Sequence, residues 1–122
     1  MKSLLFVFLG GGLGSVSRYG IQLLTGYLWP NVSIFPLKTL LVNIIGSFAA
    51  GLLVGHLLNH PARWLQLLLV IGFCGGFTTF SAFSTDIIQL LQIKAYGMAT
   101  LYLLLSVACC VVATGIGVFL MK

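Results

Sequence analysis

Four long apolar stretches most strongly constrain the fold of this chain of 122 residues; they lie roughly at residues 3–24, 37–58, 64–92 and 97–120. A membrane-spanning helix needs about 20 apolar residues, because the hydrocarbon layer is about 30 Å thick. The chain carries six Lys or Arg residues and one acidic residue, too few for the charged exterior of a soluble domain. We therefore predict an all-α membrane protein, a single transmembrane domain of four helices over residues 1–122.

Turn-forming and interfacial residues separate the four stretches. These residues are Tyr27, Trp29, Pro30, Pro36, Pro61, Trp64 and Tyr96. Tyr and Trp at the ends of spans are typical of the aromatic belt at a membrane interface. Asn31-Val32-Ser33 in the first loop also matches a glycosylation sequon, which we attribute to chance.

Charge and cysteine patterns exclude several functional classes. The formal net charge is +5, but the basic residues stand singly and form no patch for a nucleic-acid backbone. The cysteines (Cys74, Cys109 and Cys110) lie in apolar stretches without the spacing of a zinc site, so we interpret them as packing residues. The sequence also has no nucleotide-binding glycine motif and no catalytic constellation. We predict no nucleic-acid partner, no organic cofactor and no enzymatic activity.

Basic residues specify no preferred orientation in the membrane. They divide equally between the two sides that four spans define: Lys2, Arg63 and Lys122 against Arg18, Lys38 and Lys94. Orientation normally follows an excess of Lys and Arg in the cytoplasmic loops, and this chain has none. We therefore predict dual topology, in which two copies of opposite orientation pair as an antiparallel homodimer. The alternative is that one charge fixes a single orientation.

Small and polar residues recur every four positions along the second stretch, at Thr39, Asn43, Ser47, Gly51 and Gly55. Small residues at this spacing let helix backbones approach closely, so we expect this row to serve the pairing of the two copies. Asn43 lies at membrane depth, where its amide needs hydrogen-bond partners. The sequence leaves open whether this amide is an interhelical clamp or a functional group.

The third stretch is too long for one straight span. Residues 64–92 would form a helix of about 43 Å at about 1.5 Å per residue, which exceeds the bilayer core. Gly75-Gly76, followed by Thr78-Thr79, predicts two half-helices joined by a break near residues 75–79. Backbone groups freed there must be satisfied by protein, a cavity or an ion, and such carbonyls can hold a cation. The alternative is an unbroken helix with a glycine-rich packing face.

Aromatic and hydroxyl side chains surround the predicted break. Phe77, Phe80 and Phe83 are three residues apart, so neighbouring rings would share a helix face. Such a stripe is usually core packing, but ring edges carry partial positive charge and can line a path for a small anion. The fourth stretch has a polar row, at Tyr102, Ser106, Cys110 and Thr114. This row would form a corridor with the rings, unless its hydroxyls bond their own i−4 carbonyls.

Three blocks of sequence carry a family resemblance: GGGLGSVSRYG at 10–20, KTLLVNIIGSFAAG at 38–51 and GFCGGFTTFSAFS at 72–84. With them, the chain resembles the Fluc (CrcB) fluoride channels over essentially its whole length. The third block is highly specific, because it combines a helix break, paired Thr and two Phe at fixed spacing. Ala82 stands where that family often has Thr, and Cys110 interrupts the hydroxyls of the fourth span. Neither departure puts the function in doubt.

The resemblance implies an antiparallel, dual-topology homodimer in the bacterial inner membrane, with two fluoride pores and a structural sodium ion at the dimer interface. Such a channel would export fluoride passively and confer fluoride resistance, with fluoride ions, the lipid bilayer and a second copy as its partners. By position, the pore residues would be Phe80, Phe83, Asn43, Ser81, Thr79, Tyr102, Ser106, Cys110 and Thr114. The carbonyls of Gly75 and Thr78 would hold sodium, and Arg18 and Lys38 would attract anions at the entrance.

The main alternative is a small multidrug-resistance-like transporter, which also has about this length, four spans and dual topology. Proton-coupled export of cationic drugs requires a titratable carboxylate in the membrane. Asp86 is the single acidic residue of the chain and lies beyond the break, which argues strongly against this alternative. A non-conducting membrane subunit would explain the apolar composition but not the block at 72–84.

Overall fold

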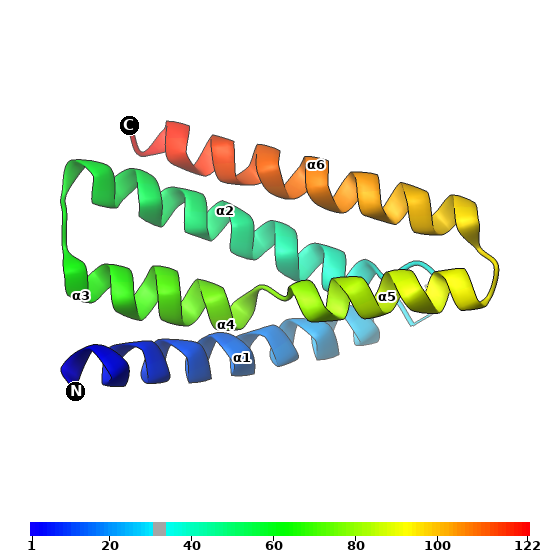
Figure 1. Ribbon diagram of the computed structural model, residues 1–122, viewed down its shortest axis with the longest axis horizontal. Coiled ribbons are helices and arrows are strands. Elements are labelled where there is room, and N and C mark those ends of the chain that lie inside the picture. Colours follow the sequence, from blue (N-terminus) through cyan, green and yellow to red (C-terminus); the bar gives the residue numbers. More distant parts are fainter. Residues whose placement is uncertain (31–33) are drawn as a thin grey trace.

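The computed structural model describes residues 1–30 and 34–122, and within them it contains helices and no strands (Figure 1). Helices α1 (Lys2–Leu28), α2 (Leu37–Asn59) and α6 (Tyr96–Leu120) are continuous. The third span consists of α3 (Arg63–Leu65), the π-helix η1 (Gln66–Cys74), α4 (Gly75–Phe77) and α5 (Phe80–Gln92). The predicted all-α fold is confirmed. The sequon at residues 31–33 lies outside the described residues.

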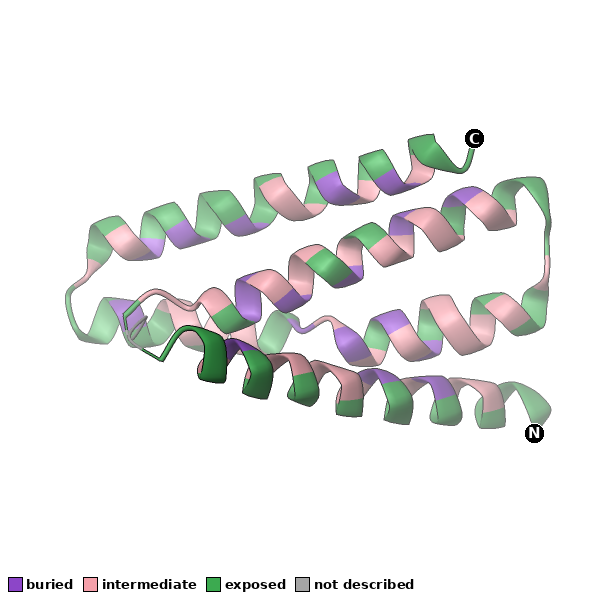
Figure 2. Cartoon of the chain, turned by 180° about the vertical axis from the view of Figure 1, so that it is seen from behind, coloured by how far each residue is buried: buried purple, intermediate pink, exposed green. Residues whose placement is uncertain are grey.

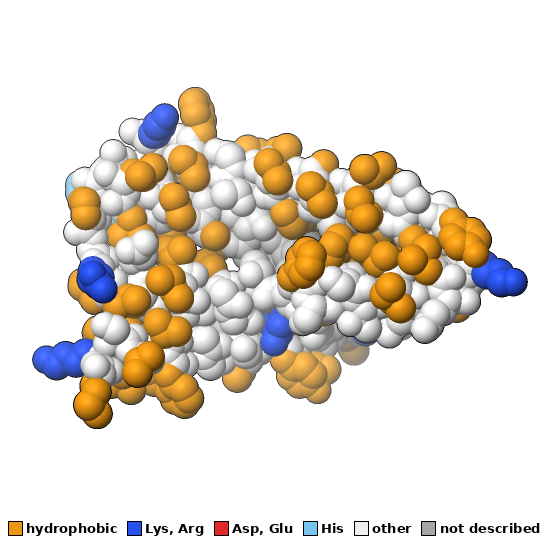
Figure 3. All heavy atoms as spheres, viewed as in Figure 1, with side chains coloured by type: hydrophobic (Ala, Val, Ile, Leu, Met, Phe, Trp, Pro, Cys, Tyr) orange, Lys and Arg blue, Asp and Glu red, His pale blue; other side chains and the backbone are white. Residues whose placement is uncertain are grey.

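Four helical segments of the described chain are long and apolar enough to cross a membrane, as the sequence predicts. The first is longer than expected, since α1 continues to Leu28. Large hydrophobic side chains such as Leu4, Val16 and Phe119 are exposed. In Figure 3, hydrophobic side chains cover the flanks, while most visible Lys and Arg side chains lie toward the two ends of the long axis. This distribution suits a bundle surrounded by lipid with its ends in water.

Two close helix pairs organise the bundle: α1 lies along η1 and α4, and α2 lies along α6. Glycines make both contacts close. A Cβ on Gly14 of α1 would lie 2.9 Å from the backbone nitrogen of Phe77. In the other pair, a Cβ on Gly117 of α6 would lie 2.6 Å from the carbonyl oxygen of Phe48. Each helix pair therefore depends on residues without a side chain at the contact.

The small-residue row of α2 packs within the chain, which corrects our expectation that it pairs two copies. A Cβ on Gly55 would lie 2.8 Å from the carbonyl oxygen of Val118, and one on Gly51 would overlap the carbonyl of Thr114. Both partners belong to α6. A repeat of small residues predicts a close helix contact but does not identify the helix that supplies the partner.

The third span is interrupted at Thr78 and Thr79, inside the region that the sequence indicates (Figure 1). Thr78 (φ −75°, ψ 155°) and Thr79 (φ −146°, ψ 115°) are extended. Gly75, with φ −64° and ψ −36°, is helical. The interpretation that Gly75 and Gly76 break the helix is therefore wrong. Gly76 instead allows close packing on α1, because a Cβ there would overlap the carbonyl of Gly11.

Buried residues lie along the inner faces of the helices (Figure 2). One buried cluster, made of Leu40, Leu90, Ala99 and Tyr102, joins α2, α5 and α6. Both chain ends lie at the opposite end of the bundle, the end at which α3 begins (Figure 1). The break between α4 and α5 lies near the middle of the long axis (Figure 1). In a bundle that spans the bilayer, this position is at the depth of the bilayer centre.

Candidate functional site

The Asn43 side chain clamps the break of the third span. Its Nδ2 donates to the carbonyl oxygen of Thr79 at 3.1 Å, and its Oδ1 accepts from the Thr79 N–H at 2.8 Å. The Thr79 hydroxyl caps α5, because it accepts from the backbone N–H of Ala82 at 3.1 Å. Both polar backbone groups of Thr79 are thereby satisfied at membrane depth. The interhelical clamp that the sequence left open is present.

The same clamp removes the helical donor from the Gly75 carbonyl. In a continuous helix, the Thr79 N–H would donate to the oxygen of Gly75, four residues earlier, but here it donates to Asn43. Gly75 is exposed on the surface of the chain, and a Cβ built there meets no atom within 4 Å. Of the carbonyls expected to hold a cation, that of Gly75 is in the last helical turn before the break and that of Thr78 is in the extended segment.

A groove of about 490 Å³ runs beside the break. It brings together residues of α2, α6 and the third span that are far apart in the sequence. The expected site residues among its lining are Asn43, Gly75, Thr78, Thr79, Phe80, Phe83, Ser106, Cys110 and Thr114. The fold thus places most of the residues singled out from the sequence on one surface of the chain.

Phe80 and Phe83 lie at the start of α5, with ring centres 5.5 Å apart and an interplanar angle of 46°. Phe80 is 79% exposed, whereas Phe83 packs against the Tyr102 ring at 5.4 Å. Phe77 is buried and stacks on Phe73 at 5.8 Å. The expectation that neighbouring rings share a face is confirmed for Phe80 and Phe83 and wrong for Phe77, because the extended residues Thr78 and Thr79 interrupt the helical spacing between Phe77 and Phe80.

The polar row of α6 has members with different surroundings. The Thr114 hydroxyl lies 3.0 Å from the carbonyl oxygen of Cys110 and 3.1 Å from that of Ser47, so it is bonded to backbone. This is the local bonding that the sequence left open as an alternative. The buried Ser106 hydroxyl, in contrast, has no hydrogen-bond partner among the described residues. Buried hydroxyls are normally hydrogen-bonded, and Ser106 is one of the residues that line the groove.

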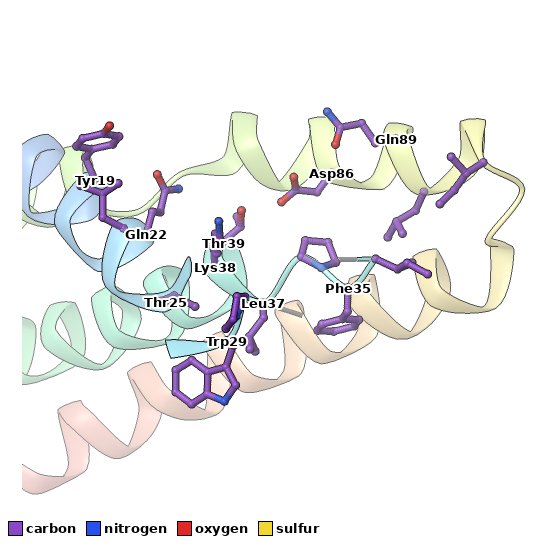
Figure 4. A pocket seen from close by; sticks show the side chains of 16 residues that line it. Tyr19, Gln22, Thr25, Trp29, Phe35, Leu37, Lys38, Thr39, Asp86 and Gln89 are labelled. Carbon is purple, nitrogen blue, oxygen red and sulfur yellow. The ribbon is translucent and has the colours of Figure 1, made fainter. Parts of the chain in front are cut away.

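The residues expected at the entrance line two adjoining hollows. Arg18 and Ser81 line a hollow of about 420 Å³, and Lys38 lines a larger one of about 760 Å³. Gln22 and Asp86 line both, so the two hollows adjoin each other. Figure 4 shows side chains of α1, α2 and α5 around the larger hollow, Gln22, Lys38 and Asp86 among them. Arg18, Lys38 and Ser81 do not line the groove; they line these two hollows, here called the vestibule, and Thr79 lines both the vestibule and the groove.

Asp86 is a site residue whose contact the sequence analysis missed. Its Oδ2 accepts a hydrogen bond from the Tyr102 hydroxyl at 3.1 Å, and the Tyr102 side chain is fully buried. Tyr102, which does not line the groove itself, thus connects the vestibule to the ring of Phe83. A signal was present, because a carboxylate within apolar sequence needs a partner. Only the fold shows that α6 supplies it.

Comparison with known proteins assigns the family. The model of the family described as CrcB-like protein, Camphor Resistance (CrcB), matches residues 5–118. The chain belongs to the CrcB family. The matched residues include the greater part of every span, the clamp by Asn43 and the break at Thr78 and Thr79.

Curated relatives of this CrcB-family chain match it over most of their length. A protein named fluoride-specific ion channel FluC from Azobacteroides pseudotrichonymphae is 42% identical, over 88% of this chain and 86% of the relative. A protein of the same name from Bacteroides fragilis is also 42% identical, with the same coverage. One from Gloeothece citriformis is 43% identical over 100% of this chain and 98% of the relative. The family resemblance is confirmed, and relatives named as ion channels agree with the prediction that the chain is not an enzyme.

Proposed function

We propose that this chain is a fluoride-selective ion channel that exports fluoride passively from the cytoplasm and confers fluoride resistance. The names of the relatives support the choice of ion. The observation that carries the proposal is the groove beside the break, where the rings of Phe80 and Phe83 share one lining with the unpartnered hydroxyl of Ser106. A narrow, partly aromatic passage with few hydrogen-bond donors suits a small anion that must lose water.

Selectivity would come from groups that replace the water around fluoride. Fluoride is small and strongly hydrated, so removing its water without compensation is prohibitive. The Ser106 hydroxyl can donate a hydrogen bond, and the edges of the Phe80 and Phe83 rings carry partial positive charge. Cys110 and Thr114 extend the same lining along α6. Larger anions would be disfavoured by the width of such a passage.

The residues at the break would position these groups. Asn43 holds Thr79 in place, and Thr79 caps the helix that carries Phe80 and Phe83. Ser81 lies on the vestibule side with Arg18, where an anion would arrive still hydrated. These residues would form the remainder of the path together with Lys38 and Tyr102. The Tyr102 hydroxyl donates a hydrogen bond to Asp86, which lines the vestibule.

An antiparallel homodimer with two pores would complete this architecture. Phe80 is 79% exposed, and Gly75, in the helical turn before the break, is also exposed on the surface of a single chain. Interrupted backbone is not tolerated against lipid, so we expect a second copy of the chain to pack over this surface. The equal division of basic residues between the two sides would allow that copy to insert in the opposite orientation.

A sodium ion fits the backbone at the centre of this dimer. The Gly75 carbonyl has lost its helical donor to Asn43, and Gly75 has open space around it. Carbonyl oxygens from unwound backbone are suitable ligands for sodium, so Gly75 and Thr78 of each copy would hold the ion. When bound, sodium supplies a fixed positive charge that offsets the repulsion between two fluoride ions near the midplane.

Passive flow through such a channel would protect a bacterial cell. Hydrogen fluoride crosses membranes as a neutral molecule, ionises in the less acidic cytoplasm and is trapped there as an anion. A channel in the inner membrane would let the membrane potential drive fluoride outward. Arg18 and Lys38 would raise the local concentration of anions at the vestibule.

Ion efflux from liposomes that contain only the purified protein tests the function. Liposomes loaded with potassium fluoride and treated with valinomycin should release fluoride rapidly, whereas matched liposomes loaded with potassium chloride should retain chloride. Absence of fluoride efflux from a folded protein would overturn the proposal. Coupled exchange of protons for a cationic drug would instead support the multidrug transporter.

Charge-biased copies test the antiparallel assembly. Two extra Lys residues next to Lys2 should force one orientation, and two next to Lys94 should force the other. Each biased copy alone should give no fluoride resistance in cells, and co-expression of both should restore it. Full activity of one biased copy on its own would contradict the antiparallel homodimer.

A further inference from the structure

His56 and His60 form a pair of imidazoles at the end of α2, far from the groove and the vestibule. They are the only two histidines of the chain. His56 lies in the last turn of α2, and His60, which is exposed, follows the helix and donates its backbone N–H to the His56 carbonyl at 2.9 Å. Their ring centres are 5.1 Å apart, with an interplanar angle of 40°.

We propose that His56 and His60 together bind one divalent late-transition-metal ion of the Cu²⁺, Ni²⁺ or Zn²⁺ class. Metal–imidazole bonds are about 2.0–2.1 Å long, so two imidazoles at right or tetrahedral angles on one ion have ring centres roughly 4.5–5 Å apart. The observed spacing of 5.1 Å is close to this requirement, and rotation of the two side chains can bring one nitrogen of each ring to a shared ion. Water would complete the coordination, since two side chains leave positions open.

The chemistry of the ligands selects the metal class. Neutral imidazole suits Cu²⁺, Ni²⁺ and Zn²⁺, whereas Na⁺, Mg²⁺ and Ca²⁺ prefer oxygen ligands. For nitrogen ligands the affinity increases from Ni²⁺ to Cu²⁺ and is lower again for Zn²⁺, so Cu²⁺ should bind to the two imidazoles most tightly of the three. This site is therefore chemically distinct from the carbonyl site proposed for sodium.

The local surroundings favour a cation at this position. The carbonyl end of α2 carries the negative partial charge of the helix dipole. The Asn59 side chain, between the two histidines in the sequence, is held by hydrogen bonds that its Nδ2 donates to the carbonyls of Gly55 and Met121 at 3.4 and 2.9 Å.

Metal binding would tie the last turn of α2 to the connection that leads into the third span. His56 belongs to the helix, and His60 is the first residue after it. An ion that binds both histidines only in the folded chain stabilises that fold by linkage. The inference does not depend on fluoride conduction, since neither histidine lines the groove or the vestibule.

The test uses the full-length protein in detergent, with any purification tag removed and metals stripped by a chelator. Calorimetric titration with CuCl₂ should detect one ion per chain. His56→Gln and His60→Gln should each weaken binding at least tenfold, and the double variant, which has no imidazole, should weaken it further. Gln66→Asn, which changes a polar residue of the neighbouring span end and leaves both imidazoles in place, should bind as the native chain does. Copper should also raise the melting temperature of the native chain but not of either histidine variant.

Two outcomes would overturn the proposal: no binding of Cu²⁺ by the native chain, or undiminished binding by both single variants. Electron paramagnetic resonance of the copper complex gives an independent reading, because two coordinated imidazole nitrogens split the signal. A signal from one nitrogen, or from none, would contradict the bidentate pair. Fluoride efflux is measured on the same preparations, so that a failure of metal binding can be distinguished from a failure of the proposed channel function.

Discussion

Gly75 and Gly76 are neighbours in the same helical turn, yet they meet opposite surroundings. A Cβ on Gly76 would overlap the carbonyl oxygen of Gly11 on α1, whereas a Cβ on Gly75 would meet no atom within 4 Å. Gly75 is also the exposed one of the pair. One glycine is required by a contact inside the chain, and the other faces whatever lies outside it.

The third span therefore has two faces, a packed face and an open face. The packed face joins η1 and α4 to α1 through backbone contacts at Gly14 and Gly76. The open face carries Gly75, the groove and the exposed ring of Phe80. Substitutions on the packed face should act on the stability of each chain, whereas those on the open face should act on assembly and conduction.

The largest effect is expected on the packed face, from Gly76→Ala. The added methyl group would overlap backbone rather than a movable side chain, so the cost should reach or exceed the usual overpacking range of about 1–3 kcal/mol. Unfolding in detergent, followed by helical circular dichroism, should show a large loss of stability. Gly12→Ala on α1 is the control, because a Cβ there also meets no atom within 4 Å. Equal stability of the two variants would remove the distinction between the faces.

Asn43→Leu should give the next largest effect, because Asn43 holds the junction between the two faces. Its loss leaves the N–H and the carbonyl of Thr79 unpaired, at about 1–3 kcal/mol for each buried group. Asn59→Leu is the matched control, since Asn59 also makes two backbone hydrogen bonds but is exposed, so water can replace them. Unfolding by denaturant measures both. A smaller loss for Asn43→Leu than for Asn59→Leu would contradict the clamp.

The spans and the position of the break could be predicted from sequence because they follow from local composition. Four apolar stretches separated by Pro, Trp and Tyr specify four helices whatever their arrangement. A long third stretch with Gly-Gly and Thr-Thr likewise specifies a weak point near its middle. These signals need no knowledge of which helix lies beside which.

The faces could not be predicted, because they depend on partners that are distant in the sequence. Gly51 and Gly55 show a spacing suited to helix pairing, and only the fold identifies α6 of the same chain as their partner. Gly75 and Gly76 were treated as one signal, although only the arrangement of α1 separates their roles. The hydrogen bond from Tyr102 to Asp86 was missed for the same reason.

Gly75→Val should leave the chain folded and act on assembly. The side chain would enter open space in the single chain, but it would disturb the carbonyls proposed to hold sodium and the surface proposed to meet a second copy. We expect the dimer to dissociate at least tenfold more readily, equivalent to about 1.4 kcal/mol. Gel filtration over a dilution series measures the dimer fraction. An unchanged dimer with unchanged fluoride efflux would argue against a structural ion at this position.

Phe80→Ile and Phe83→Ile should each reduce fluoride efflux at least tenfold, equivalent to about 1.4 kcal/mol in the barrier. Ile keeps the apolar bulk but removes the positive ring edge, so the ion loses a partner where its water is removed. Packing alone would predict a mild effect, because volume-conserving apolar changes cost little. Phe119→Ile is the control, since Phe119 is 78% exposed and Phe80 is 79% exposed. Near-normal efflux in both groove variants would return these rings to a packing role.

The smallest effect is expected from Cys110→Ser, which tests whether the open face tolerates exchange between similar donors. Cys110 lines the groove between Ser106 and Thr114, and a hydroxyl there can donate a hydrogen bond as the thiol does. Fluoride efflux should therefore change by less than about threefold, whereas Cys110→Ile, which removes the donor and fills the groove, should reduce it strongly. Cys109 does not line the groove, so Cys109→Ile should leave efflux near normal. If Cys109→Ile and Cys110→Ile change fluoride efflux to the same extent, the polar row of α6 does not line the path of the ion. On the open face, fluoride would then contact the rings of Phe80 and Phe83 alone.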